Sequence, residues 1–413
     1  MRGPIARATM RTSAVLGLRL LAQAGTLLVV ARMLGPQHYG AFAGIAALAV
    51  LMGTLSTFGT HLVLLREVSR EPQQRAHVLP FALTTTLLCG SALLALYLLL
   101  SLTLFHAAGI AASVLIALGI TELLLQPLLN LPAAELQGQG RIATSQVFIT
   151  LPLALRLCAA LLVWVWQPAD PLAAYAWGYL AASALTLLAA QRSLQQAWPA
   201  LRTWRLPRRA ELRDAAGYAV LNTTATGPAE LDKTLAATLL PLAVAGVYAA
   251  GARVIGALTL PVIAMMLSAM PRLFREAASD AQRTRHLLRW LFAAALGYSL
   301  LLAAVLWLAA PLFDWLFGAR YHGLGDTLRW LTLAVPGMAL RITAGSVLMT
   351  LGKPWMRVGF EVVGLLVLSI AAFTLIASGV GEAMPIALAC GEWSMALLGG
   401  IMLLDMRRKG HEP

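Results

Sequence analysis

The sequence predicts an all-α, polytopic membrane protein with about twelve transmembrane helices. Hydrophobic residues make up 59% of the 413-residue chain and charged residues only 12%, and the mean hydropathy is +0.76. A soluble chain could not hide so much apolar surface. Apolar runs of about twenty residues recur throughout, and this is the length that a helix needs to cross a hydrocarbon core of roughly 30 Å.

The apolar runs fall into two sets of six. Hydropathy and turn signals place the first six spans at 13–32, 41–64, 78–104, 109–131, 143–166 and 171–191. The second six are expected at 214–238, 245–270, 288–310, 326–350, 356–378 and 383–404, of which 214–238 is the least apolar. We therefore predict two six-helix lobes, residues 1–200 and 201–413, joined by an Arg-, Trp- and Pro-rich linker near 192–213.

A weak internal repeat favours two parallel lobes. The residues Leu34, Gly40, Phe42 and Ala43 recur 206 positions later as Leu240, Gly246, Tyr248 and Ala249. A displacement by six helices preserves the orientation of each helix in the membrane. The expected arrangement is two lobes related by an axis along the membrane normal, as in alternating-access transporters.

The positions of the basic residues predict the orientation of the chain. Of the 31 Lys and Arg residues, 23 fall on the first set of alternate connections or at the two ends, from Arg2 to Lys409. The opposite set holds four, namely Arg32, Lys233, Arg320 and Arg329. Since basic loops stay in the cytoplasm, both termini are expected there. The same rule explains the net charge of +13 without nucleic-acid binding, for which no basic and aromatic surface motif is present.

Charged residues within the predicted spans are the candidate functional residues. The remaining four arginines lie inside spans: Arg19, Arg156, Arg253 and Arg341. On insertion scales an Arg at a helix centre costs roughly 2.5–3.5 kcal/mol, so these side chains are expected to face an internal cavity. Acidic or basic residues also lie within or near the spans at Glu122, Asp232, Lys233, Glu361 and Glu392.

A cavity lined by arginine suits a phosphate-bearing substrate. The guanidinium fork matches phosphate oxygens, and several such groups on different helices can hold a pyrophosphate diester without a metal. Arg19, Arg253, Arg341 and Arg156 are therefore the substrate-binding candidates. The alternative is that each arginine pairs structurally with a carboxylate, and Glu122 with Arg156 is one such expected pair.

The seventh predicted span is the most polar and carries coupling or gating candidates. It contains Gly227-Pro228, which should kink or break the helix, followed by Glu230, Asp232 and Lys233. Their carboxylates are candidates to carry a coupling proton or sodium ion, as are the intramembrane residues Glu122 and Glu392. The alternative is that Asp232 and Lys233 are solvated at the periplasmic mouth.

No cofactor or metal site is expected. The seven histidines lie in loops or near span ends without metal-ligand spacing, and the three cysteines lie far apart in separate apolar runs. No phosphate-cradling glycine loop, nucleophile elbow or zinc signature is present. An enzymatic function is therefore not expected.

Several short motifs resemble those of polysaccharide exporters and O-antigen flippases. The segment 31–40, ARMLGPQHYG, followed by Phe58-Gly59-Thr60, is similar to the opening of that family. The segment 232–253, with Leu260-Pro261 and Met270-Pro271 beyond it, is similar to its seventh and eighth helices, and 316–321 resembles a later connection.

The resemblance implies a flippase of the multidrug/oligosaccharidyl-lipid/polysaccharide (MOP) superfamily, with a MATE-like fold of two six-helix lobes. It implies an oligosaccharide on undecaprenyl pyrophosphate as substrate, turned from the cytoplasmic to the periplasmic leaflet of the bacterial inner membrane. Membrane lipids and other polysaccharide-assembly proteins are the implied partners. By position, Arg19 and Arg253 are the best candidates to hold the pyrophosphate.

Two other functions are alternatives for a multi-pass membrane protein of this kind. A drug or metabolite exporter shares the fold, but it is favoured by an acidic and aromatic cavity, whereas the intramembrane charge here is net basic. A polymerase or ligase of polysaccharide assembly needs a sizeable periplasmic loop, and the exterior connections predicted here are short.

Overall fold

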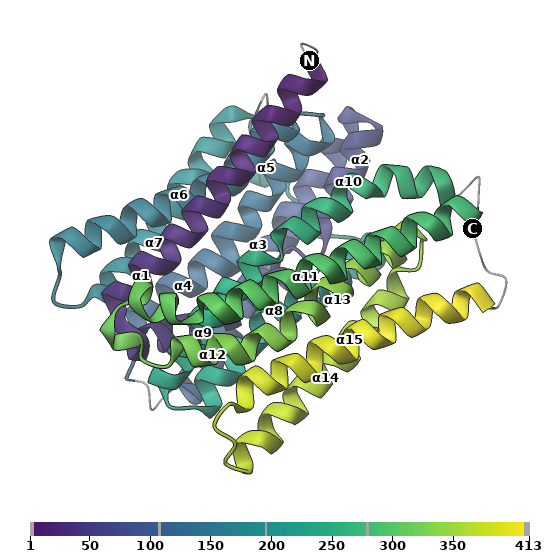
Figure 1. Cartoon of the computed structure of the whole chain (residues 1–413). Helices are drawn as coiled ribbons and strands as arrows, with labels where there is room; N and C mark the ends of the chain where they lie inside the picture. Colours follow the sequence, from purple (N-terminus) through teal and green to yellow (C-terminus); the bar gives the residue numbers. More distant parts are fainter. Residues whose placement is uncertain (1–3, 106–108, 195, 278–280, 409–413) are drawn as a thin grey trace. The chain divides into compact units, whose positions relative to one another are not determined.

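The computed structural model describes residues 4–105, 109–194, 196–277 and 281–408, and within these ranges its regular structure is helical (Figure 1). The all-α, multi-pass class predicted from hydropathy is thereby confirmed. Arg2 and Lys409, the first and last basic residues used for the orientation, lie outside the described residues.

The helices follow one another with short connections. The first half comprises α1 (Pro4–Ser56), α2 (Thr60–Arg70), α3 (Arg75–Leu104), α4 (Ala112–Ile120), the π-helical turn η3 (Thr121–Leu125), α5 (Gln126–Gly138), α6 (Ile142–Trp166) and α7 (Pro171–Ser193). The second comprises α8 (Arg209–Leu239), α9 (Leu242–Leu258), α10 (Leu260–Ala277), α11 (Ala281–Phe317), α12 (Leu324–Leu331), α13 (Val335–Thr350), α14 (Pro354–Ala377) and α15 (Ala383–Arg408). Short 3₁₀ turns are η1 (Pro72–Gln74), η4 (Leu201–Thr203), η5 (Ala319–Tyr321) and η6 (Thr332–Ala334).

Ten segments of the described chain are long and apolar enough to cross a membrane. One of them, Gly17–Ser56, is 40 residues long and contains most of the first two predicted spans, because α1 continues past the non-helical Gly35. The polar helix α8 is not among the ten, in keeping with its low predicted hydropathy. These two differences account for ten segments where twelve spans were predicted.

A tight turn at residues 57–59 ends the second predicted span earlier than expected. The span was placed at 41–64, but α1 ends at Ser56 and α2 begins at Thr60. Phe58 and Gly59 both have positive φ, and a Cβ on Gly59 would lie 2.4 Å from the carbonyl oxygen of Ala215. Glycine is required here because the backbones approach so closely.

Helix α8 is continuous across Gly227-Pro228, so the predicted break does not occur. Proline removes one backbone hydrogen bond, yet it is tolerated within helices of membrane proteins when other groups satisfy the freed carbonyl. The carbonyl that Pro228 frees is that of Thr224. Threonine hydroxyls of the same stretch bond to other carbonyls of the helix, as in the 2.9 Å bond from Thr226 Oγ1 to the Asn222 carbonyl.

The chain divides into two compact units, Met1–Thr226 (unit 1) and Gly227–Pro413 (unit 2). The division falls inside α8. Residues of α8 before it pack within unit 1: Asp214 pairs with Arg66 of α2 at 2.5 Å, and Thr223 bonds to Thr54 of α1 at 2.9 Å. Beyond it, Gly227 packs against Leu365 of α14 within unit 2.

The helix pattern of unit 1 recurs in unit 2. α4, α6 and α7 begin at residues 112, 142 and 171, and α12, α14 and α15 begin at residues 324, 354 and 383, each 212 positions later. In both units an irregular turn, η3 or η6, follows the first of these helices. The same pattern of helix starts therefore builds both units, although the sequence motifs barely repeat.

Connections that were predicted to share one side of the membrane contact one another in unit 1. Arg75, at the start of α3, pairs with Glu135 near the end of α5 at 2.6 Å. Its Nη2 also donates to the carbonyl of Gln196, in the connection after α7, at 2.9 Å. The three connections therefore lie at the same end of the unit, and the prediction that this end is cytoplasmic stays a prediction.

Candidate functional site

Unit 1 contains a buried charge cluster around Arg156. Arg156 Nη2 donates to Glu122 Oε1 at 3.2 Å and to Ser183 Oγ at 2.9 Å. The hydroxyl of Tyr179 donates to the same Glu122 oxygen at 2.5 Å, and the Arg156 guanidinium lies 3.6 Å from the centre of the Tyr179 ring. Arg156 and Glu122 are 7% and 6% exposed. The ion pair given above as the alternative for these two residues is thus present.

The backbone at Glu122 is shaped by a π-helical turn and by two glycines. Glu122 lies in η3, and π-turns within helices occur frequently at functional sites. A Cβ on Gly53 would lie 2.4 Å from the Glu122 carbonyl oxygen, and one on Gly90 would lie 2.4 Å from that of Leu123. α1 and α3 therefore reach the turn only because both positions are glycine.

Unit 2 contains a second buried cluster around Arg341. Arg341 Nε donates to Glu392 Oε2 at 2.6 Å, and Arg341 Nη1 lies 4.0 Å from Glu361 Oε1. Arg357 Nε donates to that same Glu361 oxygen at 2.9 Å. The second oxygens of both carboxylates, Glu361 Oε2 and Glu392 Oε1, are buried and have no hydrogen-bond partner among the described residues.

Small residues bring the two carboxylates of unit 2 together. α14 and α15 lie side by side (Figure 1). A Cβ on Gly364 of α14 would meet Met395 of α15 at 2.0 Å, and one on Gly391 would lie 3.0 Å from Leu368 Cβ. Glu361 precedes Gly364 by one turn and Glu392 follows Gly391, so this close helix contact fixes the position of both acids.

A second polar cluster of unit 2 involves α8 and α9. Asp232 Oδ1 pairs with Lys233 Nζ at 3.1 Å, and Asp232 Oδ2 accepts a hydrogen bond from the Tyr248 hydroxyl at 2.8 Å. Lys233 Nζ also donates to the carbonyl of Ala229. Both charged side chains are buried, at 2% and 5% exposure, so the alternative of solvated groups at a periplasmic mouth is wrong.

The remaining candidates are Arg19, Arg253 and Glu230. Arg19 of α1 is partly buried, and its Nε is buried without a hydrogen-bond partner among the described residues. Arg253 of α9 is half-buried. Glu230 of α8 is also half-buried, and its Oε2 has no partner in the described chain.

Two of the four candidate arginines are bound to carboxylates. The guanidinium groups of Arg156 and Arg341 each form an ion pair with a carboxylate of the same unit. A buried arginine that is neutralised in this way holds the fold in one arrangement and is costly to disrupt. Both Arg19 and Arg156 have a buried Nε without a hydrogen-bond partner among the described residues, but Arg19, unlike Arg156, has no carboxylate within ion-pair distance there.

Sequence reasoning missed several members of these clusters. Arg357 lies four residues before Glu361, which the sequence analysis had named, and this spacing places both on one helix face, so the signal for Arg357 was available. Glu135 lay beyond the predicted end of its span at 131, which hid it as a buried acid. No local signal marks Tyr179 or Tyr248, because their partners come from distant helices.

Comparison with solved structures identifies the fold as that of the MOP transporter superfamily. An inward-facing multidrug resistance MATE family transporter superposes with a TM-score of 0.79 at 15% identity, covering 96% of this chain and 99% of that one. A MATE protein in complex with MaL6 gives 0.67 at 17% identity, covering 99% and 98%. A MOP transporter from Pyrococcus furiosus, described as having a binding pocket of reverse polarity, gives 0.66 at 17%, covering 96% and 94%.

The family follows from the sequence itself. The model of the polysaccharide biosynthesis protein family matches residues 5–277, which is more than half of the chain. The chain therefore belongs to this family, as the motifs in the first helices and in α8 and α9 indicated. A search of curated proteins finds no significant match.

Proposed function

We propose that this protein is a flippase that moves an oligosaccharide linked to undecaprenyl pyrophosphate across the bacterial inner membrane. Its membership of the polysaccharide biosynthesis family and the MOP transporter fold support this proposal. The substrate carries a pyrophosphate, and the chain carries 31 basic against 18 acidic residues. The repeat unit so delivered is that of an O-antigen or of another surface polysaccharide.

The observation that carries the proposal is the difference between the intramembrane arginines. Arg156 and Arg341 form ion pairs with carboxylates, whereas Arg19 has no ion-pair partner among the described residues, and its buried Nε has no acceptor there. An unpartnered buried donor is costly unless a ligand satisfies it. We assign Arg19 to the pyrophosphate, whose oxygens match the guanidinium fork, and we propose the same role for Arg253.

Transport is proposed to occur by alternating access of the two units, with both termini in the cytoplasm. The division after Thr226 lies next to Gly227-Pro228 in α8, and a proline in a helix leaves one backbone carbonyl without its usual donor. This part of α8 is therefore the proposed site of bending. The connection before α8 is unsuited to this role, since its contacts lie within unit 1.

A cation gradient is the proposed energy source, carried by protons or sodium. The buried carboxylates Glu122, Asp232 and Glu392 each contact a basic group or a tyrosine hydroxyl, and Glu392 keeps one unpartnered oxygen. Such an oxygen is where a proton binds with least loss of existing contacts. Glu230 of α8, whose Oε2 has no partner among the described residues, is the fourth candidate. Lys233 is included because it forms an ion pair with the neighbouring Asp232.

The drug or metabolite exporter remains the second candidate because the similar solved structures include multidrug transporters. The two functions require different properties of Arg19. A pyrophosphate carrier needs the cationic group, whereas an exporter of cationic compounds is hindered by it.

Complementation of a flippase-null strain tests the proposal. Arg19→Ala and Arg253→Ala should each abolish surface polysaccharide at normal membrane abundance, and the Lys variants should restore part of it, because Lys keeps the charge but loses the fork. Arg192→Ala, which removes an exposed arginine at the end of α7, is the control and should behave as wild type. Full activity of both Ala variants would refute the assignment.

A further inference from the structure

The connection between α7 and α8, residues 196–208, is bound tightly to unit 1, and we call it the strap. Its first anchor is Arg75 at the start of α3. Arg75 Nη2 donates to the carbonyls of Gln196 and Ala197 at 2.9 and 3.2 Å, and Arg75 Nε donates to the buried Glu135 at 2.6 Å. Trp198 and Trp204 of the strap pack against the hydrophobic core of the unit.

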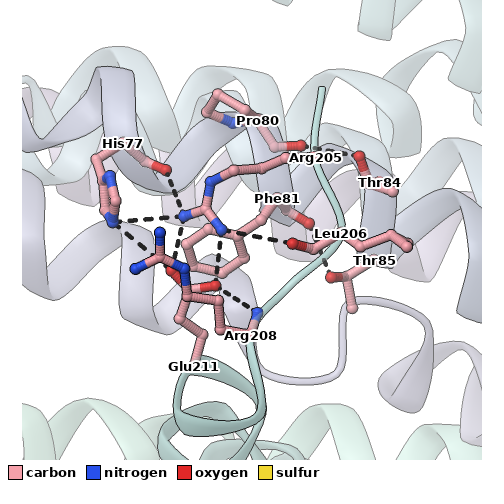
Figure 2. Close-up of polar contacts among 9 residues, drawn as sticks. All are labelled: His77, Pro80, Phe81, Thr84, Thr85, Arg205, Leu206, Arg208 and Glu211. Carbon is pink, nitrogen blue, oxygen red and sulfur yellow. Dashed lines mark hydrogen bonds and ion pairs between the residues drawn. The ribbon is translucent and has the colours of Figure 1, made fainter. Parts of the chain in front are cut away.

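The second anchor lies at the other end of the strap (Figure 2). The Arg205 guanidinium lies 4.8 Å from the centre of the Phe81 ring and donates to both carboxylate oxygens of Glu211, at 2.6 and 2.8 Å. It also donates to the His77 carbonyl at 3.3 Å. The backbone amide of Arg208 donates to Glu211 as well, at 2.7 Å.

The second anchor stays intact across the physiological pH range. The hydrogen bonds from Arg205 lower the pKa of Glu211 from its ordinary value of 4.5 to about 2, so the carboxylate remains charged at any cellular pH. A planar guanidinium bound through two oxygens and stacked on an aromatic ring is a rigid arrangement. The strap is therefore held in one conformation at both ends.

Between and beside these anchors the strap exposes apolar side chains. Leu201 is 77% exposed and Leu206 is 68% exposed. Leu308, in the apolar candidate span Gln282–Phe317, is exposed to a similar extent, at 80%. Because the anchors hold the strap in place, these leucines stay exposed and are available to an apolar medium.

Exposed basic side chains follow the two leucines closely along the chain. Arg202, Arg208, Arg209 and Arg213 are all exposed, and a surface hollow between α8 residues is lined by Arg209, Ala210, Arg213 and Asp214. The neighbouring arginine of the anchor, Arg205, is already neutralised by Glu211. Exposed leucines bordered by arginines are typical of a segment that lies in the head-group layer of an anionic membrane.

We propose that the strap is a docking surface for anionic phospholipid head groups of the cytoplasmic leaflet. Leu201 and Leu206 insert below the head groups, while Arg202 and Arg208, with Arg209 and Arg213 at the start of α8, contact lipid phosphates. The proposal uses the predicted cytoplasmic position of this end of unit 1. It does not depend on which substrate is carried.

Fluorescence quenching by brominated lipids tests the insertion. In a full-length protein whose three cysteines are replaced by alanine, a bimane label is placed at Leu201→Cys, Leu206→Cys or Thr203→Cys and the protein is reconstituted in vesicles. Thr203, exposed on the same turn as Leu201, is the matched control. Labels at 201 and 206 should be quenched severalfold more than the label at 203. Equal quenching at the three positions would overturn the proposal.

The charge preference is tested in the same vesicles. Brominated phosphatidylglycerol should quench the label at 201 more than an equal fraction of brominated phosphatidylcholine, and 1 M salt should remove the difference. The double variant Arg202→Gln/Arg208→Gln should lose this preference, whereas Arg192→Gln/Arg289→Gln, two exposed arginines on the same predicted side, should retain it.

Two outcomes contradict the lipid assignment. An unchanged preference in Arg202→Gln/Arg208→Gln would remove the arginines from it. Labels at 201 and 206 that are shielded both from brominated lipid and from aqueous iodide would show that a protein surface covers the leucines instead. Because no outcome involves transport, the result is independent of the flippase activity.

Discussion

Replacing Arg341 by methionine should destabilise the protein strongly, because it leaves the buried carboxylate of Glu392 without its ion-pair partner. Arg341 Nε and Glu392 Oε2 are 2.6 Å apart, and the two residues are 7% and 0% exposed. At an effective dielectric of 20, charges at this distance attract by about 6 kcal/mol before desolvation. Removing one partner of a buried pair typically costs about 3–5 kcal/mol, because the other charge remains buried and unpaired.

Thermal unfolding in detergent measures this effect. Each kcal/mol lowers the melting temperature of a domain of 150–250 residues by about 2–4 °C, so Arg341→Met should melt about 6–20 °C below wild type. Adding Glu392→Gln should recover most of the lost melting temperature, since it removes the buried charge that has no partner. Adding Glu361→Gln instead should not, because Glu361 still has Arg357 at 2.9 Å and its removal leaves that arginine unpaired.

Two results would refute this reasoning. If Arg341→Met has the same melting temperature as wild type, the ion pair does not hold the helices together, and a substrate role for Arg341 regains support. If the Glu361→Gln double variant recovers as well as the Glu392→Gln one, the charge that Arg341 neutralises is shared over the whole cluster. The three variants together therefore assign the partner of Arg341.

Two further predictions concern the orientation and the anchor of the strap. In a cysteine-free background, a cysteine at Ala169 should react with an impermeant thiol reagent added to intact cells, and one at Ala200 should not; labelling at Ala200 would invert the topology. Because Arg205 depresses the pKa of Glu211 to about 2, the stability from this carboxylate is complete above pH 4.5 and is lost as the pH falls toward 2. Denaturation of Glu211→Gln in detergent should therefore show a constant deficit of about 1–3 kcal/mol from pH 5 to 8 that shrinks below pH 4, and a deficit that varies between pH 5 and 8 would contradict the assignment.

The family was readable from the sequence because it depends on short, local patterns. The motif around Leu34-Gly35-Pro36 resembles the family on residues that lie next to one another, and the family model covers this region. In the structure Gly35 has φ 71°, a conformation that favours glycine, which explains why the motif contains it. The polar character of α8 was equally visible in the sequence.

The sequence could not predict which buried charges form pairs, because the partners lie far apart along the chain. Arg341 and Glu392 are 51 positions apart, and Arg75 and Glu135 are 60 apart. A hydropathy profile marks each charge as unusual but contains no information on which helix faces it. The separation of Arg19 from Arg156 and Arg341 therefore needed the tertiary structure.

The sequence by itself determined that the chain is a bundle of membrane-crossing helices, because span length and apolar content are properties of consecutive residues. Only the tertiary structure decided that the basic connection before α8 is a fixed part of unit 1. That outcome rests on contacts such as Arg205 with His77, 128 positions apart, and on the close approach of Gly59 to α8. Composition predicted a linker between two lobes there, but aromatic and guanidinium side chains that find partners on other helices bind the segment in place.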